Sequence, residues 1–181
     1  LDLDNEVGPL FKATSFPTMV IIGKGGKIQA VNIGNVGDLE SRMKTQLDAL
    51  IAGKPIPQIK TAQAPPKPKQ ATSASLIGKP APAFTSSTIG GKSLATADFA
   101  KHPATVLNFF APNCGYCKKQ IPRMETVRQN YEEKGIRFVN VSQKMRKDYS
   151  QEEVVQMLEG LGFKGEVAID HTNSIGGKFS A

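Results

Sequence analysis

Cys114 and Cys117 are the two residues of this chain whose type and spacing could do chemistry. They are its only cysteines, and two residues separate them. A disulfide-stapled secreted fold spreads its cysteines along the chain, whereas a close pair indicates thiol–disulfide redox chemistry or half of a metal site. His102 and His171 are the only histidines, and neither is closely spaced with a cysteine. We therefore expect no metal ion and no cofactor, although a dimer would bring four thiolates together.

A buried strand and a helix are predicted to hold this pair. Residues 105–110 (Thr-Val-Leu-Asn-Phe-Phe) are the strongest buried-strand candidate of the chain. Residues 114–131 are predicted to form a helix that Pro122 interrupts and kinks, because proline lacks an N–H and clashes with the preceding turn. A cysteine pair between a strand and a helix is a more specific signal than the pair alone.

The position at a helix start assigns different roles to the two cysteines. Free N–H groups and the helix dipole there favour a thiolate over a thiol, and Lys118 and Lys119 add positive charge. Cys114 is thus predicted to attack a substrate disulfide, and Cys117 to resolve the mixed disulfide. An inert structural disulfide is the alternative, but a bond that closes so short a loop would stabilise the fold little.

Composition is that of a globular protein containing both helices and strands. Hydrophobic residues make up 39% of the 181 residues, which is enough to fill a core. The net charge is +7, but four of the 23 basic residues lie in one Pro-rich segment. Because no basic cluster lies on a helix or between stacking aromatics, nucleic-acid binding is not expected. No apolar run reaches the length of a membrane span, so none is predicted in this chain.

Three segments of different composition follow one another. Residues 54–76 are rich in proline and lysine, cannot bury enough apolar surface to fold, and are predicted to form an extended linker. Residues 1–53 and 77–181 each show the pattern of part of an α/β fold. In residues 1–53 we predict strands at 19–22 and 27–33, joined as a hairpin, and a helix from the N-cap Asp38 to Gly53. In residues 77–181 we predict strands at 105–110, 136–141 and 165–170 and helices at 114–131 and 152–161. Ser150 is the predicted N-cap of the helix at 152–161.

The two ends of the chain are similar to each other. Residues 1–13 align without gaps on residues 169–181, with Asp, Asn, Gly, Phe and Ala at identical places. Coincidence is one interpretation of so short a match, and a chain cut from a tandem array is the other. Leu1 is not an initiator Met, so a leader peptide could have been removed.

Several stretches together resemble the TlpA/ResA type of thioredoxin domain. Residues 77–84, residues 91–94 and residues 106–122, with Cys-Gly-Tyr-Cys, are similar to its opening half, and the resemblance runs on to Asp170. Residues 11–53, with Phe-Pro-Thr, a hairpin and a last helix, are similar to its closing half. The resemblance implies an α/β, thioredoxin-like fold with a central mixed sheet flanked by helices, in which the C-terminal half comes first and the N-terminal half second.

The resemblance also implies roles for residues outside the cysteine pair. Pro17 is similar to the family's cis-proline, which lies beside the cysteines and receives substrate backbone. Phe16 would line the groove or serve as a core aromatic, and Tyr116 would be exposed beside the thiol. Asn113 stands where the family usually has tryptophan, and Asn108 stands in the place of thioredoxin's buried aspartate. A buried proton acceptor is therefore not expected at Asn108.

These observations predict a thiol–disulfide oxidoreductase, either a reductase or an isomerase, with protein disulfide substrates and a thiol reductant partner. The Gly-Tyr dipeptide between the cysteines is similar to that of the disulfide isomerase DsbC, but it does not separate the two activities. A peroxiredoxin-like peroxidase would need Thr or Ser where this chain has Ala111. A non-catalytic thioredoxin-like binding module is the third interpretation. The resemblance and the linker indicate an extracytoplasmic protein, periplasmic or secreted, within a longer membrane-anchored or multidomain chain.

Neither half is expected to be stable alone, because each would leave an open strand edge and an apolar face. We therefore expect residues 1–53 to complete the sheet of residues 77–181, as a circular permutation within one chain or as a strand-exchanged dimer. Pro17 would then lie within van der Waals reach of Cys114 and Cys117. One copy of the two matching ends would be displaced, because both compete for one position.

Overall fold

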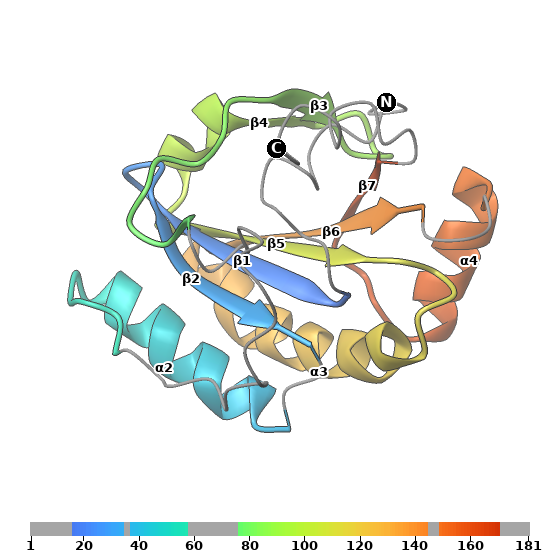
Figure 1. Cartoon of the computed structure of the whole chain (residues 1–181), viewed down its shortest axis with the longest axis horizontal. Coiled ribbons are helices and arrows are strands. Elements are labelled where there is room, and N and C mark those ends of the chain that lie inside the picture. Colours follow the sequence, from blue (N-terminus) through green and yellow to red (C-terminus); the bar gives the residue numbers. More distant parts are fainter. Residues whose placement is uncertain (1–15, 35–36, 58–75, 145–148, 171–181) are drawn as a thin grey trace, which may run out of the picture.

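A mixed five-stranded sheet organises the protein, whose computed structural model describes residues 16–34, 37–57, 76–144 and 149–170. The strands are β1 (Thr18–Gly23), β2 (Ile28–Ile33), β3 (Thr85–Ser87), β4 (Ser93–Ala95), β5 (Ala104–Phe110), β6 (Arg137–Gln143) and β7 (Glu166–Asp170). The helices are α2 (Leu39–Ile51), α3 (Gly115–Tyr131) and α4 (Gln151–Gly160), with 3-10 helices η2 (Thr96–Lys101) and η3 (Glu132–Lys134). The sheet has the order β2-β1-β5-β6-β7, and β3 pairs with β4 in a separate hairpin (Figure 1).

The central strands are buried on both faces of the sheet. Helices α2 and α3 cover one face, and the β3–β4 hairpin with η2 covers the other (Figure 1). Alternate residues of β5 therefore enter different cores: Val106 and Phe110 pack with the helices, whereas Leu107 and Phe109 pack on the hairpin side. Burial on both faces explains why β5 is an almost continuous apolar run.

The N-terminal segment adds two strands, β1 and β2, to the sheet, and one helix, α2, to the layer that covers it. β1 runs antiparallel to β5, from Thr18 opposite Phe109 to Gly23 opposite Ala104. α2 packs against α3 on the helical face. The structure thus places β1, β2 and α2 of the N-terminal segment against the strands and helices of the C-terminal segment within one chain, while the division into two halves of one domain, a permutation and an exchange between two chains stay predictions.

Most predicted elements are confirmed to within two residues at each end. Ser150 caps α4 as predicted, because its Oγ accepts the Glu153 N–H and the Glu153 carboxylate accepts the Ser150 N–H. Asp38 precedes α2, but its side chain makes no capping hydrogen bond. Pro122 lies inside α3, which continues as one helix on both sides of it, so the predicted interruption is wrong. The linker residues 58–75 and the matching ends, apart from Ile169 and Asp170, lie outside the described residues.

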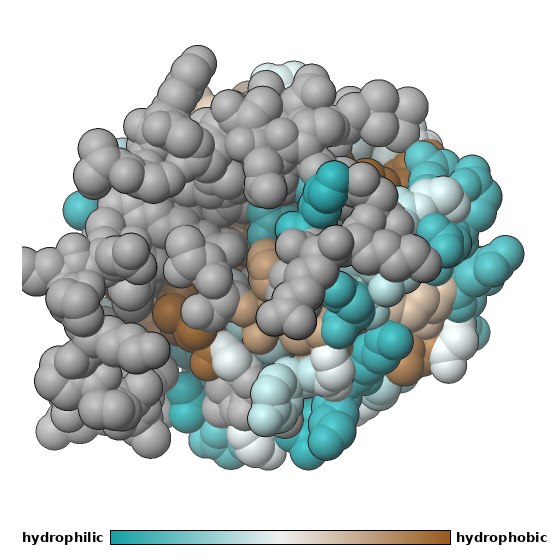
Figure 2. Space-filling view, turned by 45° about the vertical axis from the view of Figure 1, so that its right-hand side comes forward, coloured by the Kyte–Doolittle hydropathy of each residue, from teal (hydrophilic) through white to brown (hydrophobic). Residues whose placement is uncertain are grey.

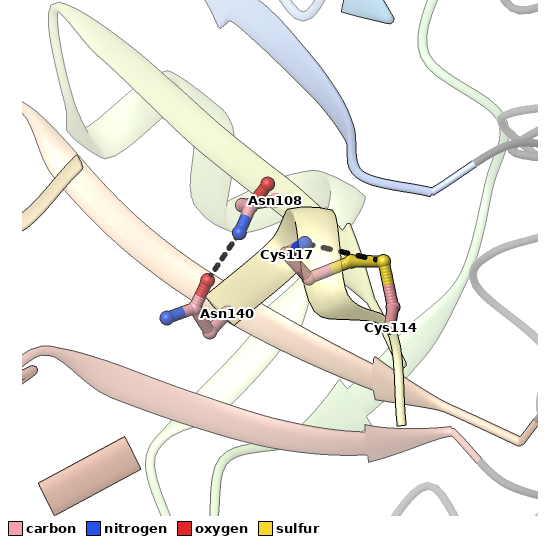
Figure 3. Close-up of a disulfide and its surroundings, with 4 residues drawn as sticks. All are labelled: Asn108, Cys114, Cys117 and Asn140. Atoms are coloured by element: carbon pink, nitrogen blue, oxygen red, sulfur yellow. Dashed lines mark hydrogen bonds between the residues drawn. A yellow bond between two sulfur atoms is a disulfide. The ribbon is translucent and has the colours of Figure 1, made fainter. Parts of the chain in front are cut away.

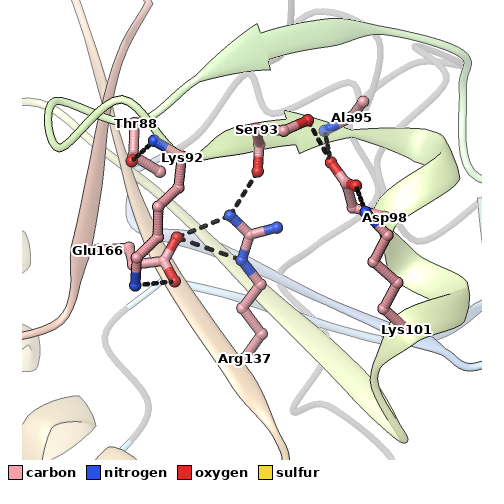
Figure 4. A network of polar contacts seen from close by, with 8 residues as sticks. All are labelled: Thr88, Lys92, Ser93, Ala95, Asp98, Lys101, Arg137 and Glu166. Atoms are coloured by element: carbon pink, nitrogen blue, oxygen red, sulfur yellow. Dashed lines mark hydrogen bonds and ion pairs between the residues drawn. The ribbon is translucent and has the colours of Figure 1, made fainter.

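A polar network fastens the hairpin to the sheet (Figure 4). Arg137 of β6 donates to the Glu166 carboxylate of β7 at 2.7 Å and to the Ser93 carbonyl of β4 at 2.7 Å. Asp98 of η2 accepts from the Ser93 hydroxyl at 2.6 Å and from the Lys101 ammonium at 2.7 Å. The sequence does not predict this hairpin, because strands of three residues show no apolar alternation.

On the face shown in Figure 2, hydrophilic side chains cover most of the coloured area, and the apolar patches between them are small. None of the helices α2, α3 and α4 is long and apolar enough to cross a membrane.

Candidate active site

Cys114 is the N-cap residue of α3, at the point where the chain leaves β5 and the helix begins. Its backbone is extended (φ −86°, ψ 108°), and its sulfur accepts a hydrogen bond from the Cys117 N–H at 3.2 Å. This bond satisfies one of the N–H groups that a helix start leaves free. The predicted place of the cysteine pair, between a strand and a helix, is therefore confirmed.

The two cysteines form a disulfide (Figure 3), and both residues belong to the buried core, to different depths. Cys114 keeps 8% of its surface exposed, whereas Cys117 is 0% exposed. Tyr116, between them, is 64% exposed, and Lys118 and Lys119 are also exposed. Cys114 is therefore the less deeply buried of the two residues.

The Phe16–Pro17 segment enters the sheet beside the strand that leads to the cysteines. The Phe16–Pro17 peptide bond is cis, as the resemblance implies. Pro17 is buried and precedes Thr18, which lies opposite Phe109 near the end of β5. Phe16 is half-buried and packs against the core that contains Cys114 and Cys117. The contact of Pro17 with the cysteines stays a prediction.

Two buried asparagines lie beside the first turns of α3 (Figure 3). Asn108 of β5 and Asn140 of β6 are neighbours in the parallel register, and both are 0% exposed. Asn108 Nδ2 donates to Asn140 Oδ1 at 2.6 Å. The other two amide atoms, Asn108 Oδ1 and Asn140 Nδ2, have no hydrogen-bond partner in the described part of the chain. The pair is thus polar, uncharged and half satisfied.

None of the buried amides near the cysteines is a sequence-predicted site residue, although Asn108 is singled out as standing in the place of thioredoxin's buried aspartate. Asn140 and Gln120 are not singled out by the sequence. Asn140 shares its strand face with the core residue Phe138, so the alternation of β6 already marks it as a buried amide. Gln120 follows Cys117 by one helical turn and is buried with both amide atoms unpartnered among the described residues.

Within the described residues, no group of three His, Cys, Asp or Glu side chains is arranged to hold a metal ion. The Nδ1 atom of His102 lies 3.2 Å from the carbonyl of Gly135, next to the strands β5 and β6 at their N-terminal ends. His171 lies outside the described residues.

Comparison with protein families matches residues 77–181, more than half of the chain, to the AhpC/TSA family. The chain belongs to the AhpC/TSA family. Curated relatives of this family member include proteins named thiol-disulfide oxidoreductase ResA. The ResA of Bacillus thuringiensis (strain Al Hakam) is 31% identical over 103 residues, which cover 57% of this chain and 57% of that protein. The ResA of Bacillus anthracis is also 31% identical over 103 residues, again 57% of this chain and 57% of that protein.

These relatives confirm the resemblance to the TlpA/ResA type. The chain spans little more than half the length of the curated relatives that it matches. Among solved structures, this chain is similar to a thiol:disulfide interchange protein of the thioredoxin family from Chlorobium tepidum TLS. It has 26% sequence identity and a TM-score of 0.43, and the match covers 52% of this chain and 61% of that chain. The family and the mixed sheet flanked by helices together make the fold thioredoxin-like, as expected.

Proposed function

We propose that this chain is a thiol–disulfide oxidoreductase that exchanges disulfides with protein substrates through Cys114 and Cys117. The observation that supports this most directly is the unequal burial of two bonded cysteines at a helix N-terminus. Cys114 caps α3 and keeps 8% of its surface exposed, whereas Cys117, one turn further on, is 0% exposed. The names of the curated ResA relatives point to the same class of reaction.

Cys114 is the nucleophile in this proposal. In the reduced protein, the Cys117 N–H that now bonds to the Cys114 sulfur would stabilise a thiolate there, as would the helix dipole. Lys118 and Lys119, exposed in the first turn of α3, add positive charge. A thiolate is the reactive form of cysteine in disulfide exchange, so these features favour attack by Cys114 at neutral pH.

The reaction proceeds by two thiolate attacks. The Cys114 thiolate attacks one sulfur of the substrate disulfide, which forms a mixed disulfide and releases the other substrate sulfur as a thiolate. The Cys117 thiol then loses its proton and attacks the Cys114 sulfur, which forms the Cys114–Cys117 disulfide and releases the second substrate thiolate. Two electrons thereby pass from the cysteine pair to the substrate. A partner dithiol reduces the pair again by the reverse exchange.

Phe16, Pro17 and Tyr116 form the proposed substrate-binding surface around Cys114. Tyr116 offers an exposed aromatic ring next to the reactive sulfur, and Phe16 packs against the core that holds it. Pro17 would receive the substrate backbone. Ala111, which is buried and has no hydroxyl group, disfavours a peroxidase.

We further propose that the protein is extracytoplasmic and acts as a reductase or an isomerase. The similarity to ResA proteins and the lysine- and proline-rich linker support this location. The reduction potential of the cysteine pair, measured against glutathione, separates the two activities. A potential near that of thioredoxin indicates a reductase, and a much higher potential an isomerase.

Trapping with insulin tests the proposed roles of the cysteines. Reduced Cys117→Ser protein should form a covalent adduct with insulin that dithiothreitol releases, because the resolving thiol is missing. Cys114→Ser is the matched control and should form at least about tenfold less adduct, since Cys117 is buried. In the wild type, brief iodoacetamide treatment after reduction should label Cys114 first. Equal trapping by both variants, or preferential labelling of Cys117, would contradict the assigned roles.

A further inference from the structure

Two lysines at the start of α3 lie where a helix disfavours positive charge. The N-terminal end of a helix carries a partial positive charge, so acidic side chains stabilise it and basic ones destabilise it. α2 and α4 follow this rule, with Glu40 and Glu152 in their first turns. The first turn of α3 contains no acidic residue; Lys118 ends that turn and Lys119 follows it. Helix stability therefore does not explain the two lysines.

Neither lysine has a carboxylate partner in the part of the chain that the structure describes. Both are exposed, and neither forms an ion pair there. Elsewhere an exposed lysine does find a partner, as Lys101 does with Asp98 at 2.7 Å. The acidic residue of α3 itself, Glu125, is buried and bonded to Arg128 at 2.7 Å. The two ammonium groups therefore direct positive charge toward solvent without a direct counter-charge.

Lys118 lies on the same side of the helix as the cysteine that caps it. Its N–H donates to the Cys114 carbonyl at 3.2 Å, which places the two residues one helical turn apart. Residues four apart share a helix face, and the Cα–Cβ bonds of a helix tilt toward its N-terminus. The Cβ of Lys118 thus points toward the end of α3 at which Cys114 keeps its 8% exposure (Figure 3). Lys119 and the exposed Tyr116 complete a basic surface around the cysteine.

Resting on the function proposed above, we propose that Lys118 and Lys119 select substrate proteins whose disulfide is flanked by acidic residues. Aspartate or glutamate side chains within a few residues of the substrate cysteine pair with the two ammonium groups while the Cys114 thiolate attacks. Pairs at an exposed surface add little affinity, but opposite charges raise the rate at which two molecules meet in the reactive orientation. The two thiolate attacks proceed as described above, and the lysines exchange neither electrons nor protons.

The charge of the attacking thiolate gives the lysines a second effect on such substrates. Acidic residues beside a disulfide repel an approaching thiolate, because like charges interact unfavourably. Lys118 and Lys119 offset this repulsion, which a small thiol without a cation cannot do. A nucleic acid fits the surface less well, since it needs a longer row of cations and stacking aromatics than two lysines and one tyrosine provide.

The experiment compares the reduction of three disulfide peptides that differ only in the residues beside their cysteines, which are glutamate, glutamine or lysine. Each rate constant with the reduced protein is divided by the rate constant with 2-mercaptoethanol, which corrects for the intrinsic reactivity of each disulfide. At about 10 mM ionic strength the wild type should reduce the glutamate peptide about three- to tenfold faster than the glutamine peptide, and the lysine peptide more slowly. The ratio should approach one at about 1 M salt, where the Debye length is only about 3 Å.

Substitution of the lysines should remove or reverse this preference. Lys118→Gln/Lys119→Gln should bring the ratio of glutamate to glutamine peptide close to one, and Lys118→Glu/Lys119→Glu should reverse it. Each ratio compares two peptides attacked by the same thiolate, so a change in the reactivity of Cys114 cancels. Both lysines are exposed, so these substitutions should leave the fold intact.

Lys24→Gln/Lys27→Gln is the matched control, because it removes the same charge from two exposed lysines of the β1–β2 turn. That turn lies at the other end of the sheet, since Gly23 is opposite Ala104 at the start of β5, whereas Cys114 follows the end of β5. The control variant should keep the wild-type ratio. Its loss to the same extent would mean that net charge, and not the basic surface, sets the preference.

A binding measurement separates this inference from the proposed function. Oxidised ¹⁵N-labelled protein is titrated with glutamate and glutamine peptides in which serine replaces both cysteines. Amide shifts at residues 115–119 should saturate at an about three- to tenfold lower concentration of the glutamate peptide. If no peptide disulfide is reduced but this preference is observed, the proposed function fails and the inference stands. Equal reduction rates of the two peptides, or equal binding where neither is reduced, would overturn the inference.

Discussion

Tyr131 of α3 donates a hydrogen bond of 2.7 Å to the carboxylate of Asp48 in α2, and so joins two residues that lie on opposite sides of the linker. Tyr131 is only 3% exposed. Burial, together with the bond to Asp48, raises the pKa of Tyr131, and the bonds from Tyr131 and Lys44 lower the pKa of Asp48. The contact between the two segments is therefore specific as well as apolar.

Tyr131→Phe should lower the free energy of unfolding by about 1 kcal/mol at pH 7, the usual net value of such a hydrogen bond. The difference should shrink above about pH 10, because the raised pKa of Tyr131 lets the unfolded phenol ionise before the folded one and so destabilises the wild type. Denaturant titrations across this pH range measure both effects. Tyr116→Phe, at an exposed tyrosine, should change stability by less than about 0.5 kcal/mol.

We propose that residues 1–53 and 77–181 are the closing and opening halves of one thioredoxin-like domain, joined by a linker, residues 54–76, that has no fold of its own. A protease site inserted in the linker tests this division. After cleavage the two fragments should still elute together on gel filtration, because β1 pairs with β5 along its whole length and α2 packs on α3. Fragments that separate in the absence of denaturant would show that the halves do not form one domain.

Asp98→Asn should reduce stability in a pH-dependent way. Hydrogen bonds from Lys101 and Ser93 lower the pKa of Asp98 to about 2. Because this folded value lies below the unfolded one, the carboxylate contributes its stability above about pH 4 and loses it as the pH falls toward 2. The variant should thus be about 1–2 kcal/mol less stable than wild type at pH 6 and nearly equal at pH 2.

Denaturant titration at several pH values measures the Asp98 effect. Asp38→Asn is the control, since the exposed Asp38 pairs with Arg42 at 3.3 Å within one helical turn. That pair should contribute less than about 0.5 kcal/mol. A constant gap between Asp98→Asn and wild type from pH 6 to pH 2 would argue against the proposed titration.

Gly165→Ala should destabilise the protein by about 1–3 kcal/mol, the range for overpacking a core. A Cβ at Gly165 would lie 2.5 Å from Phe163 Cζ and 2.8 Å from Arg128 Cδ. Arg128 cannot move freely, because its guanidinium is bonded to Glu125 at 2.7 Å. Thermal unfolding measures the loss, and Gly160→Ala is the matched control. Gly160 ends α4 with open space around it, so alanine there should be neutral or stabilising.

Local patterns made much of this fold predictable. The apolar run at residues 105–110 predicts strand β5, because a strand buried on both faces is apolar throughout. The alternation at residues 27–33 predicts strand β2, because a strand buried on one face alternates apolar and polar residues. The Ser150 cap predicts where α4 begins. The β3–β4 hairpin could not be predicted in this way, since Thr85–Ser87 and Ser93–Ala95 are too short to show an alternation of apolar residues, and part of their support is a hydrogen bond from the distant Arg137.

By itself, the sequence determined that two cysteines meet at a helix start after a buried strand, because spacing, strand pattern and helix pattern are all local properties. Only the tertiary structure decided that Cys117 is fully buried while Cys114 keeps 8% of its surface exposed, and that Asn108 pairs with Asn140. The physical reason is that periodicity shows which face of an element is apolar but not which distant element covers it. Burial of a sulfur and satisfaction of an amide both depend on that covering partner.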